Sequence, residues 1–356
     1  MKKVLISGTG LFTPEESITN QELIDSFNAY VELFNQRHAA EIERGEVQAL
    51  RTSFPEFVEK ASGIKARYVI NKSGILDPER MYPIIAERSD DEQSLQCEMA
   101  VKAVQEALAK AGKTGADIDA VIVACSNMQR AYPAMSIEIQ NAIGAKGFAF
   151  DMNVACSSAT FGLQTAADMI RSGSAKCVLM VNPEICSGHL EWRDRNCHFI
   201  FGDVCTTVIL ESEDTCTNPQ AWEIVGTKLQ TQFSNNIRNN FGFLNRCDES
   251  GVGKRDKLFH QEGLKVFKEV CPMVAEQITQ HLGELSLVST DLKRMWLHQA
   301  NSNMNALIAR RVLDRDPTPE ESPTILDTYA NTSSAGSIIA FHLHNQDLAT
   351  GDVGVI

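Results

Sequence analysis

The stretch Ala155-Cys156-Ser157-Ser158-Ala159 opens a segment with helical spacing that ends in a glycine at position 173. Ala330-Asn331-Thr332-Ser333-Ser334-Ala335 opens a second segment of the same kind, which ends in a glycine at position 351. Aligning Ser157 with Ser333 gives an offset of 176 residues (333 − 157). Because small residues allow a tight turn from strand to helix, the two stretches predict the same local structure.

A second pair of similar stretches precedes the first pair. Asp117-Ile118 leads into an apolar run that ends at Ala124-Cys125-Ser126-Asn127, and Asp291-Leu292 leads into one that ends at His298-Gln299-Ala300-Asn301. Their offset is 174 residues (291 − 117). Two similar offsets in the same order predict a duplicated α/β unit, with one copy in each half of the chain.

Strand-like and helical patterns alternate around these stretches. Residues 121–125, 177–181 and 206–210 are short and rich in β-branched side chains, as buried strands are. Residues 95–111 and 160–171 have helical spacing, and each segment is followed by a glycine, which is common just after a helix ends. The alternation predicts an α/β fold whose sheets are covered on both faces.

The expected organisation is an N-terminal half at residues 1–215 and a C-terminal half at residues 216–356. Two charged stretches, residues 28–53 and 71–95, interrupt the α/β pattern. We expect both to be insertions that cover one face of the fold, the first of them partly helical. No low-complexity linker separates the two halves.

The composition excludes several classes of protein. With 33 Lys and Arg against 46 Asp and Glu, the net charge is −13, which disfavours general binding to nucleic acid or to anionic membranes. No apolar run approaches the roughly 18 residues of a transmembrane helix, and Val4-Leu5-Ile6 is too short for a signal peptide. The ten cysteines include no C-x-x-C pair, so free thiols are expected rather than disulfides or a zinc site. These features together indicate a cytoplasmic protein.

Cys156 is a candidate nucleophile because it stands where a strand turns into a helix. A thiol at a helix N-terminus is close to unpaired N–H groups and to the positive end of the helix dipole, which lowers its pKa. The alternative is a small buried side chain with no chemical role. Taken alone, the position of Cys156 leaves both interpretations open.

Two polar residues are candidates to act beside this thiol. His298 follows the apolar run Met295-Trp296-Leu297, at the carboxyl end of a predicted strand, where active sites of α/β proteins usually lie. There it could donate a hydrogen bond to a developing oxyanion or transfer a proton, or it could be a core histidine. Asn331 is ordinarily an N-cap, but the internal repeat places it beside the position equivalent to Cys156.

Three motifs in this order resemble those of the β-ketoacyl-acyl carrier protein synthase III family. They are Cys156 within Val-Ala-Cys-Ser-Ser, the tetrapeptide His298-Gln299-Ala300-Asn301, and Asn331 followed by Thr-Ser-Ser-Ala. Flanking segments agree, namely Gly8-Thr9-Gly10 with Pro14, Gly63-Ile64-Lys65-Ala66-Arg67, Tyr132-Pro133 and Phe201-Gly202-Asp203. The resemblance covers nearly the whole chain outside the two insertions. It implies the thiolase-like duplicated five-layer αβαβα fold, usually as a homodimer.

The resemblance also implies a reaction. The Cys156 thiolate attacks an acyl thioester primer and holds the acyl group covalently. The insertions at residues 28–53 and 71–95 flank the substrate entrance, and we expect them to favour a medium-chain or longer acyl-CoA over acetyl-CoA as that primer. Malonyl-acyl carrier protein then loses carbon dioxide, while His298 and Asn331 donate hydrogen bonds to the thioester oxygen of the resulting enolate. The enolate attacks the acyl-cysteine and releases a β-ketoacyl product. No metal or other cofactor is expected, since coenzyme A and phosphopantetheine thioesters serve as substrates.

Further residues match family positions. Tyr132 matches a residue that reaches across the dimer into the partner's acyl pocket, and Phe57 stands where a tryptophan commonly stacks on the coenzyme A adenine. Lys268, Arg310 and Arg311 match basic positions that dock acyl carrier protein, although a solvated helix face is an equal alternative for the two arginines.

The chain also departs from the family pattern. Ala61 and Asn303 replace arginines, so coenzyme A could be held differently, or the primer could arrive on the carrier protein. The sequence ends at Val355-Ile356, where the family's final strand and glycine-rich loop would follow. An acyltransferase, an enzyme that condenses two long acyl chains, and a non-catalytic subunit that binds acyl carriers remain alternatives.

Overall fold

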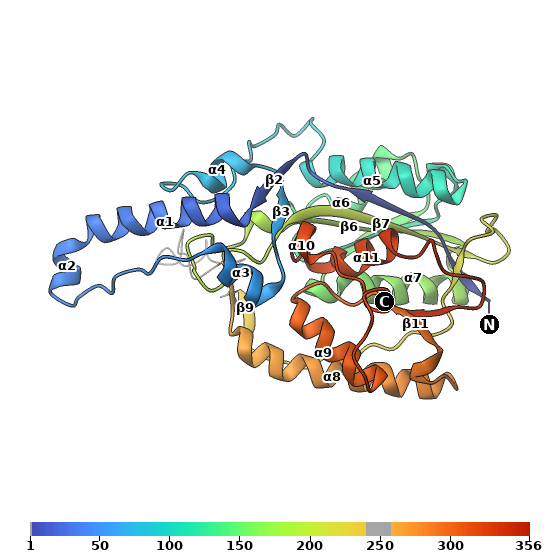
Figure 1. The fold of residues 1–356 in the computed structure, drawn as a ribbon. Coiled ribbons are helices and arrows are strands. Elements are labelled where there is room, and N and C mark those ends of the chain that lie inside the picture. The colour runs from blue at the N-terminus through green and yellow to red at the C-terminus, as the bar shows by residue number, and fades with distance from the viewer. Residues whose placement is uncertain (1, 240–257) are drawn as a thin grey trace.

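A computed structural model describes residues 2–239 and 258–356 and is built around a central mixed sheet. The strand order is β5-β4-β6-β7-β1-β8, of which β6 and β7 are labelled in Figure 1. The bounds are β1 Val4–Phe12, β4 Ala120–Ala124, β5 Phe148–Met152, β6 Cys177–Ile185, β7 Asp203–Ser212 and β8 Trp222–Glu223. Strand β4 pairs in parallel with β5 and β6, whereas β7 is antiparallel to both β6 and β1. The three strands expected from the sequence are β4, β6 and β7, each longer than or shifted slightly from its prediction.

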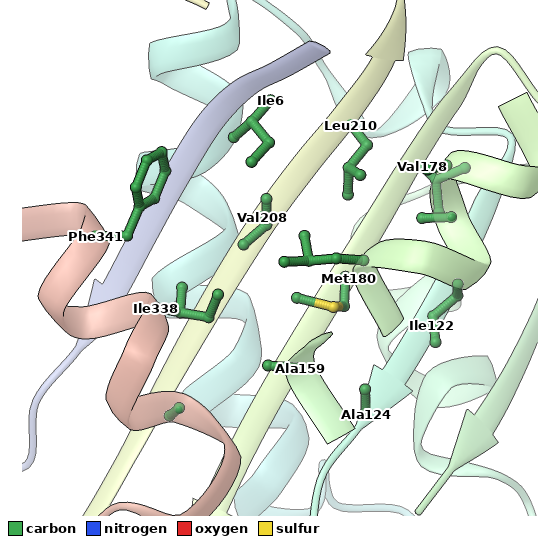
Figure 2. Packing of buried hydrophobic residues seen from close by; sticks show 14 of the residues in the cluster. Ile6, Ile122, Ala124, Ala159, Val178, Met180, Val208, Leu210, Ile338 and Phe341 are labelled. Carbon is green, nitrogen blue, oxygen red and sulfur yellow. The ribbon is translucent and has the colours of Figure 1, made fainter. Parts of the chain in front are cut away.

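Helices cover both faces of this sheet. On one face lie α5 (Leu95–Ala111) and α6 (Met135–Ala142), and on the other lie α7 (Ser158–Ser172) and α11 (Gly336–Leu343). Helix α5 begins at Ser94, whose hydroxyl accepts the Cys97 N–H, and ends at Gly112 in the left-handed conformation. Figure 2 shows the core between the sheet and α11, where Ile338 and Phe341 face Val208 and Ile6.

A second, smaller sheet completes a five-layer arrangement. Strands β11 (Leu292–Met295) and β12 (Val353–Val355) pair in parallel. Helices α8 (Gly263–Glu284) and α9 (Ser302–Leu313) pack on β11 through a separate apolar cluster. The order of layers is α5 and α6, the central sheet, α7 and α11, the small sheet, then α8 and α9. The duplicated αβαβα thiolase fold is thereby confirmed.

The internal repeat is visible in the backbone, but its second offset differs from the expected one. Two 3-10 turns precede the helices: η2 (Ala155–Ser157) before α7 and η8 (Ser333–Ala335) before α11. Each begins with a residue of positive φ, 47° at Ala155 and 52° at Ser333. The equivalent residues are therefore 178 apart (333 − 155), so aligning Ser157 with Ser333 was wrong by two residues. Cys156 corresponds to Ser334, and Asn153 corresponds to Asn331.

The first insertion forms an arm. Helix α1 (Asn20–Arg37) and the short α2 (Ala39–Glu43) project from the body, and an extended segment returns to α3 (Pro55–Ser62) (Figure 1). Two asparagines of α1 fix this returning segment. Asn28 exchanges two hydrogen bonds with the Ser53 backbone (2.9 and 3.0 Å), and Asn35 exchanges two with Leu50 (2.9 and 3.0 Å). The expected partly helical insertion is thus an ordered arm.

The second insertion contains α4 (Lys72–Leu76) and otherwise irregular chain up to residue 94. An ion pair between Arg37 and Glu79 joins it to the tip of α1. Remaining elements are β2 (Glu16–Thr19) with β3 (Ala66–Val69), β9 (Ile237–Asn239) with β10 (Phe259–Gln261), and α10 (Leu326–Tyr329). The division of the chain at residue 215 stays a prediction. Along the described ranges, 2–239 and 258–356, no helix has the length and apolarity that crossing a membrane requires.

Candidate active site

Cys156 lies in the turn η2, where the chain leaves β5 and enters α7. The side-chain oxygen of Asn153 accepts the Ala155 N–H at 2.8 Å, and the Ser158 hydroxyl oxygen accepts the Val154 N–H at 2.8 Å. These bonds hold the left-handed backbone at Ala155 that a non-glycine residue seldom adopts. The turn leaves the thiol of Cys156 half-buried rather than packed in the core.

The turn η8 faces Cys156 from the C-terminal half. The Ser333 hydroxyl lies 3.6 Å from the Cys156 sulfur and donates to it. Just before this turn, the Asn331 side-chain oxygen accepts the Ser333 N–H at 2.9 Å, as Asn153 does in the other copy. The Asn331 amide nitrogen, which can only donate, keeps its hydrogens for another acceptor, since no described residue accepts them. Asn331 is 7% exposed and is anchored by its own N–H, which donates to Ile200 O at 2.9 Å.

His298 follows β11 and is half-buried. The next residue, Gln299, is fully buried and accepts the Ile325 N–H at 3.0 Å. The Cβ of Gln299 lies 3.0 Å from the position that a Cβ on Gly336 would take. The loop that carries His298 therefore packs against the start of α11, directly after the turn η8. Burial lowers the pKa of His298 to about 4. The imidazole is therefore neutral at pH 7 and carries one N–H that can donate.

A residue that the sequence reasoning missed joins the loop after β4 to the turn η8. Glu184, in β6, is fully buried, and its carboxylate accepts hydrogen bonds from Ser126 N (3.0 Å) and Ser126 Oγ (2.5 Å). It also accepts from the N–H of Ser334 at 3.2 Å and from the Ser334 hydroxyl. Desolvation raises the pKa of this carboxyl group. An acidic residue within the apolar run 177–185 was the available sequence signal.

The electrostatic setting of Cys156 differs from the expectation. Burial raises the pKa of its thiol to about 11, the Glu184 carboxylate acts in the same direction, and the Ser333 hydrogen bond opposes both. The positive end of α7 also favours the thiolate, but no side-chain cation among the described residues acts on the Cys156 thiol. Desolvation therefore outweighs the stabilisation that the sequence position suggested, and the free thiol is mainly protonated at pH 7.

This balance predicts how Cys156 reacts with an alkylating reagent. Since the thiolate is the nucleophile and the pKa lies well above neutrality, each unit of pH should increase the iodoacetamide reaction rate about tenfold between pH 7 and pH 9. Peptide mass spectrometry would follow Cys156 itself, with half-buried Cys216 as an internal comparison. A rate that levels off below pH 8 would show that the α7 N-terminus prevails over desolvation.

The two residues expected at the substrate entrance have different surroundings. Tyr132, between β4 and α6, precedes a cis proline and is 91% exposed. Phe57 lies on α3 and packs at 6.2 Å from Phe199 (ring centroids). The guanidinium of Arg195, which sequence reasoning missed, lies 4.7 Å above the Phe57 ring.

The three basic residues expected to dock the carrier protein lie on adjacent helices. Lys268 is exposed on α8, and Arg310 and Arg311 are exposed in the last turn of α9. Helices α8 and α9 share an apolar cluster and pack together. Arg310 forms an exposed ion pair with Asp316 at 2.5 Å.

Comparisons with known proteins agree with this architecture. Family models described as 3-Oxoacyl-[acyl-carrier-protein (ACP)] synthase III and its C-terminal part match residues 150–232 and 282–356. A beta-ketodecanoyl-acyl-carrier-protein synthase from Pseudomonas aeruginosa is 61% identical over 333 residues, which are 94% of this chain and 95% of that protein. A beta-ketoacyl-acyl-carrier-protein synthase III from Granulibacter bethesdensis is 27% identical, over 98% and 92% of the two chains.

Among solved structures, the priming beta-ketosynthase of the R1128 polyketide pathway aligns with a TM-score of 0.74 at 21% identity, covering 97% of this chain and 89% of that one. This likeness concerns the fold. The identity to the Pseudomonas aeruginosa protein extends over nearly the full length of both chains, and it does not favour the alternatives of a simple acyltransferase or a non-catalytic subunit. The chain belongs to the 3-oxoacyl-acyl-carrier-protein synthase III family of condensing acyltransferases.

Proposed function

We propose that the enzyme performs a decarboxylating Claisen condensation in which Cys156 carries the primer acyl group. The observation that supports this most directly is the meeting of two equivalent turns, one bearing a half-buried thiol and the other preceded by Asn331, whose amide N–H groups no described residue accepts. In the first half-reaction the Cys156 sulfur bonds to the acyl carbon, the thioester bond to coenzyme A breaks, and the thiol proton ends on the departing coenzyme A sulfur.

The second half-reaction needs hydrogen-bond donors that stabilise negative charge, rather than a base that removes a proton. Malonyl-acyl carrier protein loses carbon dioxide, and the electrons of the broken bond form an enolate with negative charge on the thioester oxygen. The neutral His298 N–H and the amide of Asn331 would donate to that oxygen in a desolvated site, where such bonds are strong. The enolate carbon then attacks the acyl carbon on Cys156, and the thiolate leaves and is reprotonated. Because His298 is neutral, it is better suited to donate a hydrogen bond to the enolate oxygen than to stabilise that oxygen as a cation.

The primer is best assigned to the medium-chain class. The Pseudomonas aeruginosa relative is named for a ten-carbon β-ketoacyl product. Malonyl condensation adds two carbons, so that product requires an eight-carbon primer. We therefore propose octanoyl-CoA as the preferred primer of this chain as well.

Intact-protein mass spectrometry after incubation with acyl-CoA thioesters of two to fourteen carbons tests this assignment. We expect an acyl adduct that forms fastest with the eight-carbon chain and at least about tenfold more slowly with acetyl-CoA, since several buried methylenes contribute roughly 0.8 kcal/mol each. Cys156→Ala is the control that must stay unmodified. A maximum at two carbons would overturn the medium-chain assignment, and no adduct at any length would overturn priming by coenzyme A.

The assembly and the partners are proposed on structural grounds. Strand β5 is an edge strand with exposed Phe148, and Tyr132, between β4 and α6, is almost fully exposed, which supports a homodimer joined along this edge. Lys268, Arg310 and Arg311 form the proposed docking surface for the acidic acyl carrier protein. The nine described cysteines are all free thiols, which supports a cytoplasmic location.

A further inference from the structure

A closed ring of hydrogen bonds passes through Glu184 and joins the two turns at the candidate active site. The Glu184 carboxylate lies in β6, is fully buried and accepts from two sides. On one side its donors are the N–H and the hydroxyl of Ser126, in the loop after β4. On the other side they are the N–H and the hydroxyl of Ser334, in η8. Since a buried carboxylate is costly unless donors satisfy it, these bonds fix the loop and the turn relative to each other.

The loop after β4 also holds the second turn. The Asn153 side-chain nitrogen donates to Ser126 O at 2.7 Å, and the Asn153 side-chain oxygen accepts the Ala155 N–H at 2.8 Å. Ala155 begins η2, the turn that contains Cys156. Glu184 is therefore linked to η8 directly and to the Cys156 turn through Ser126 and Asn153.

The ring closes at the sulfur of Cys156. The Ser333 hydroxyl donates to that sulfur at 3.6 Å, and Ser333 immediately precedes Ser334, the residue bound to Glu184. Among the described residues, the Ser333 hydroxyl has no second hydrogen-bond partner. Its position consequently depends on the backbone of η8, which the Glu184 carboxylate holds.

Comparison of the two turns shows that the Ser333 hydroxyl is not needed to form its turn. Ser333 corresponds to Ala155, and the two residues have nearly the same positive φ, 52° and 47°. Alanine thus supports the same backbone in the other copy. The hydroxyl is an addition to a turn that forms without it, and its contact is with the sulfur of the nucleophile.

Negative charge appears on this sulfur twice in the proposed reaction. The thiolate loses its charge when it bonds to the acyl carbon of the primer, and it regains that charge when the carbon–sulfur bond breaks during condensation. A hydroxyl that donates to the sulfur stabilises the thiolate more than the uncharged acyl-cysteine. The donor matters at this site because burial and the Glu184 carboxylate both disfavour the thiolate, whereas the Ser333 hydrogen bond favours it.

We propose that Glu184 is a positioning residue, which places the Ser333 hydroxyl on the Cys156 sulfur, and that it acts through its hydrogen bonds and not through its charge. The proposal rests on the proposed function, because it takes Cys156 as the nucleophile that carries the acyl group. It adds Ser333 to that site as a catalytic residue, since the Ser333 hydroxyl touches the reacting sulfur.

The substitution Glu184→Gln separates hydrogen bonding from charge. The carboxylate oxygen Oε1 accepts from Ser126 N and from both donors of Ser334, and the new amide oxygen keeps these three bonds when it occupies the same place. The amide nitrogen then replaces Oε2, to which Ser126 Oγ and the Cys186 thiol donate at 2.5 and 3.8 Å. Both groups can accept instead, so the ring persists without the charge.

The test follows Cys156 by its iodoacetamide alkylation rate at pH 8 and by its acylation with octanoyl-CoA. For Glu184→Gln we expect faster alkylation, because a charge that opposes the thiolate is removed, and saturated acylation within about threefold of the wild type. For Glu184→Ala we expect the saturated acylation rate to fall roughly 10- to 100-fold, as displacement of a catalytic group predicts. The octanoyl-CoA concentration that gives half of that rate should stay within about twofold of the wild-type value.

Ser334→Ala breaks the ring without emptying the buried site of Glu184, so it tests the proposal even where Glu184→Ala fails to fold. We expect both alkylation and saturated acylation to fall roughly tenfold. Ser333→Ala should give the same losses, and combining it with Ser334→Ala should add little further, because both act on one hydrogen bond. Ser136→Ala is the matched control, since Ser136 is a buried serine whose hydroxyl makes no hydrogen bond with the described residues.

A loss of acylation in Glu184→Gln as large as that in Glu184→Ala would overturn the proposal, because the charge would then be the useful property. Losses that multiply in the double variant would also overturn it, as would equal behaviour of Ser334→Ala and Ser136→Ala. The alkylation comparison needs no acyl substrate. A wild-type enzyme that octanoyl-CoA fails to acylate would therefore refute the proposed function, while slower alkylation of Ser333→Ala and Ser334→Ala would still support the placement of the Ser333 hydroxyl.

Discussion

Replacing Cys156 with alanine is expected to abolish the acyl-enzyme adduct and to reduce β-ketoacyl formation by at least about 10³-fold. The sulfur is the atom that the proposed mechanism bonds to the primer, and it accepts a hydrogen bond from Ser333 of the facing turn η8. The measurement is intact-protein mass spectrometry after exposure to octanoyl-CoA, together with product formation from malonyl-acyl carrier protein.

Cys216→Ala is the matched control, because Cys216 is also half-buried but follows β7, outside the two turns. It should acquire the adduct as the wild type does. Persistence of an adduct on Cys156→Ala would assign the nucleophile to another residue. Since the substitution only shortens a half-buried side chain, loss of folding is not expected to obscure the result.

Asn331→Asp should separate the two half-reactions. The aspartate can keep the oxygen that accepts the Ser333 N–H, so the turn is preserved, but it replaces the amide donor with an acceptor. We expect carbon dioxide release and condensation to fall roughly 10²- to 10³-fold, the usual effect of removing one oxyanion donor. Acylation of Cys156 by octanoyl-CoA should change far less, because Asn331 is assigned to the enolate.

His298→Ala provides the companion experiment, and the same separation is expected because His298 is the second proposed donor. Asn141→Asp, an exposed change on α6, controls for the added charge. An equal loss of acylation and decarboxylation in Asn331→Asp would contradict a donor role confined to the second step. Near-normal decarboxylation would remove Asn331 from the proposed site.

Local patterns in the sequence predicted much of the fold. The helix expected at residues 95–111 has those bounds in the structure, because Ser94 and Gly112 are strong start and stop signals. The alignment of the two turns was wrong by two residues because it matched serine letters, Ser157 with Ser333. The equivalent backbone positions are instead Ala155 and Ser333, which both have a positive φ. Neither alanine nor serine usually adopts this conformation, so the sequence does not indicate it.

The candidate site was predictable only in part, since its electrostatics arise from contacts between distant segments. Glu184 reaches Ser126 and Ser334 across the fold, and these partners lie 58 and 150 residues away in sequence. The same burial that makes His298 neutral also raises the Cys156 pKa, and the sequence suggested only the opposing helix-terminus effect. Similarly, Arg195 lies over Phe57 and donates to Thr52 O in the arm, whose path no local pattern defines.

The two matched turns describe how such a site could have originated. An Asx-stabilised 3-10 turn before a helix occurs once in each half, with Asn153 and Asn331 making the same backbone bond. In one copy the third residue after the asparagine is the thiol Cys156, while in the other it is Ser334, bound to Glu184. Gene duplication would thus have provided the same backbone turn twice. One copy would then have specialised in forming the bond to the acyl group, and the other in stabilising negative charge. The chemistry is asymmetric, but the scaffold that bears it retains the symmetry of its ancestor.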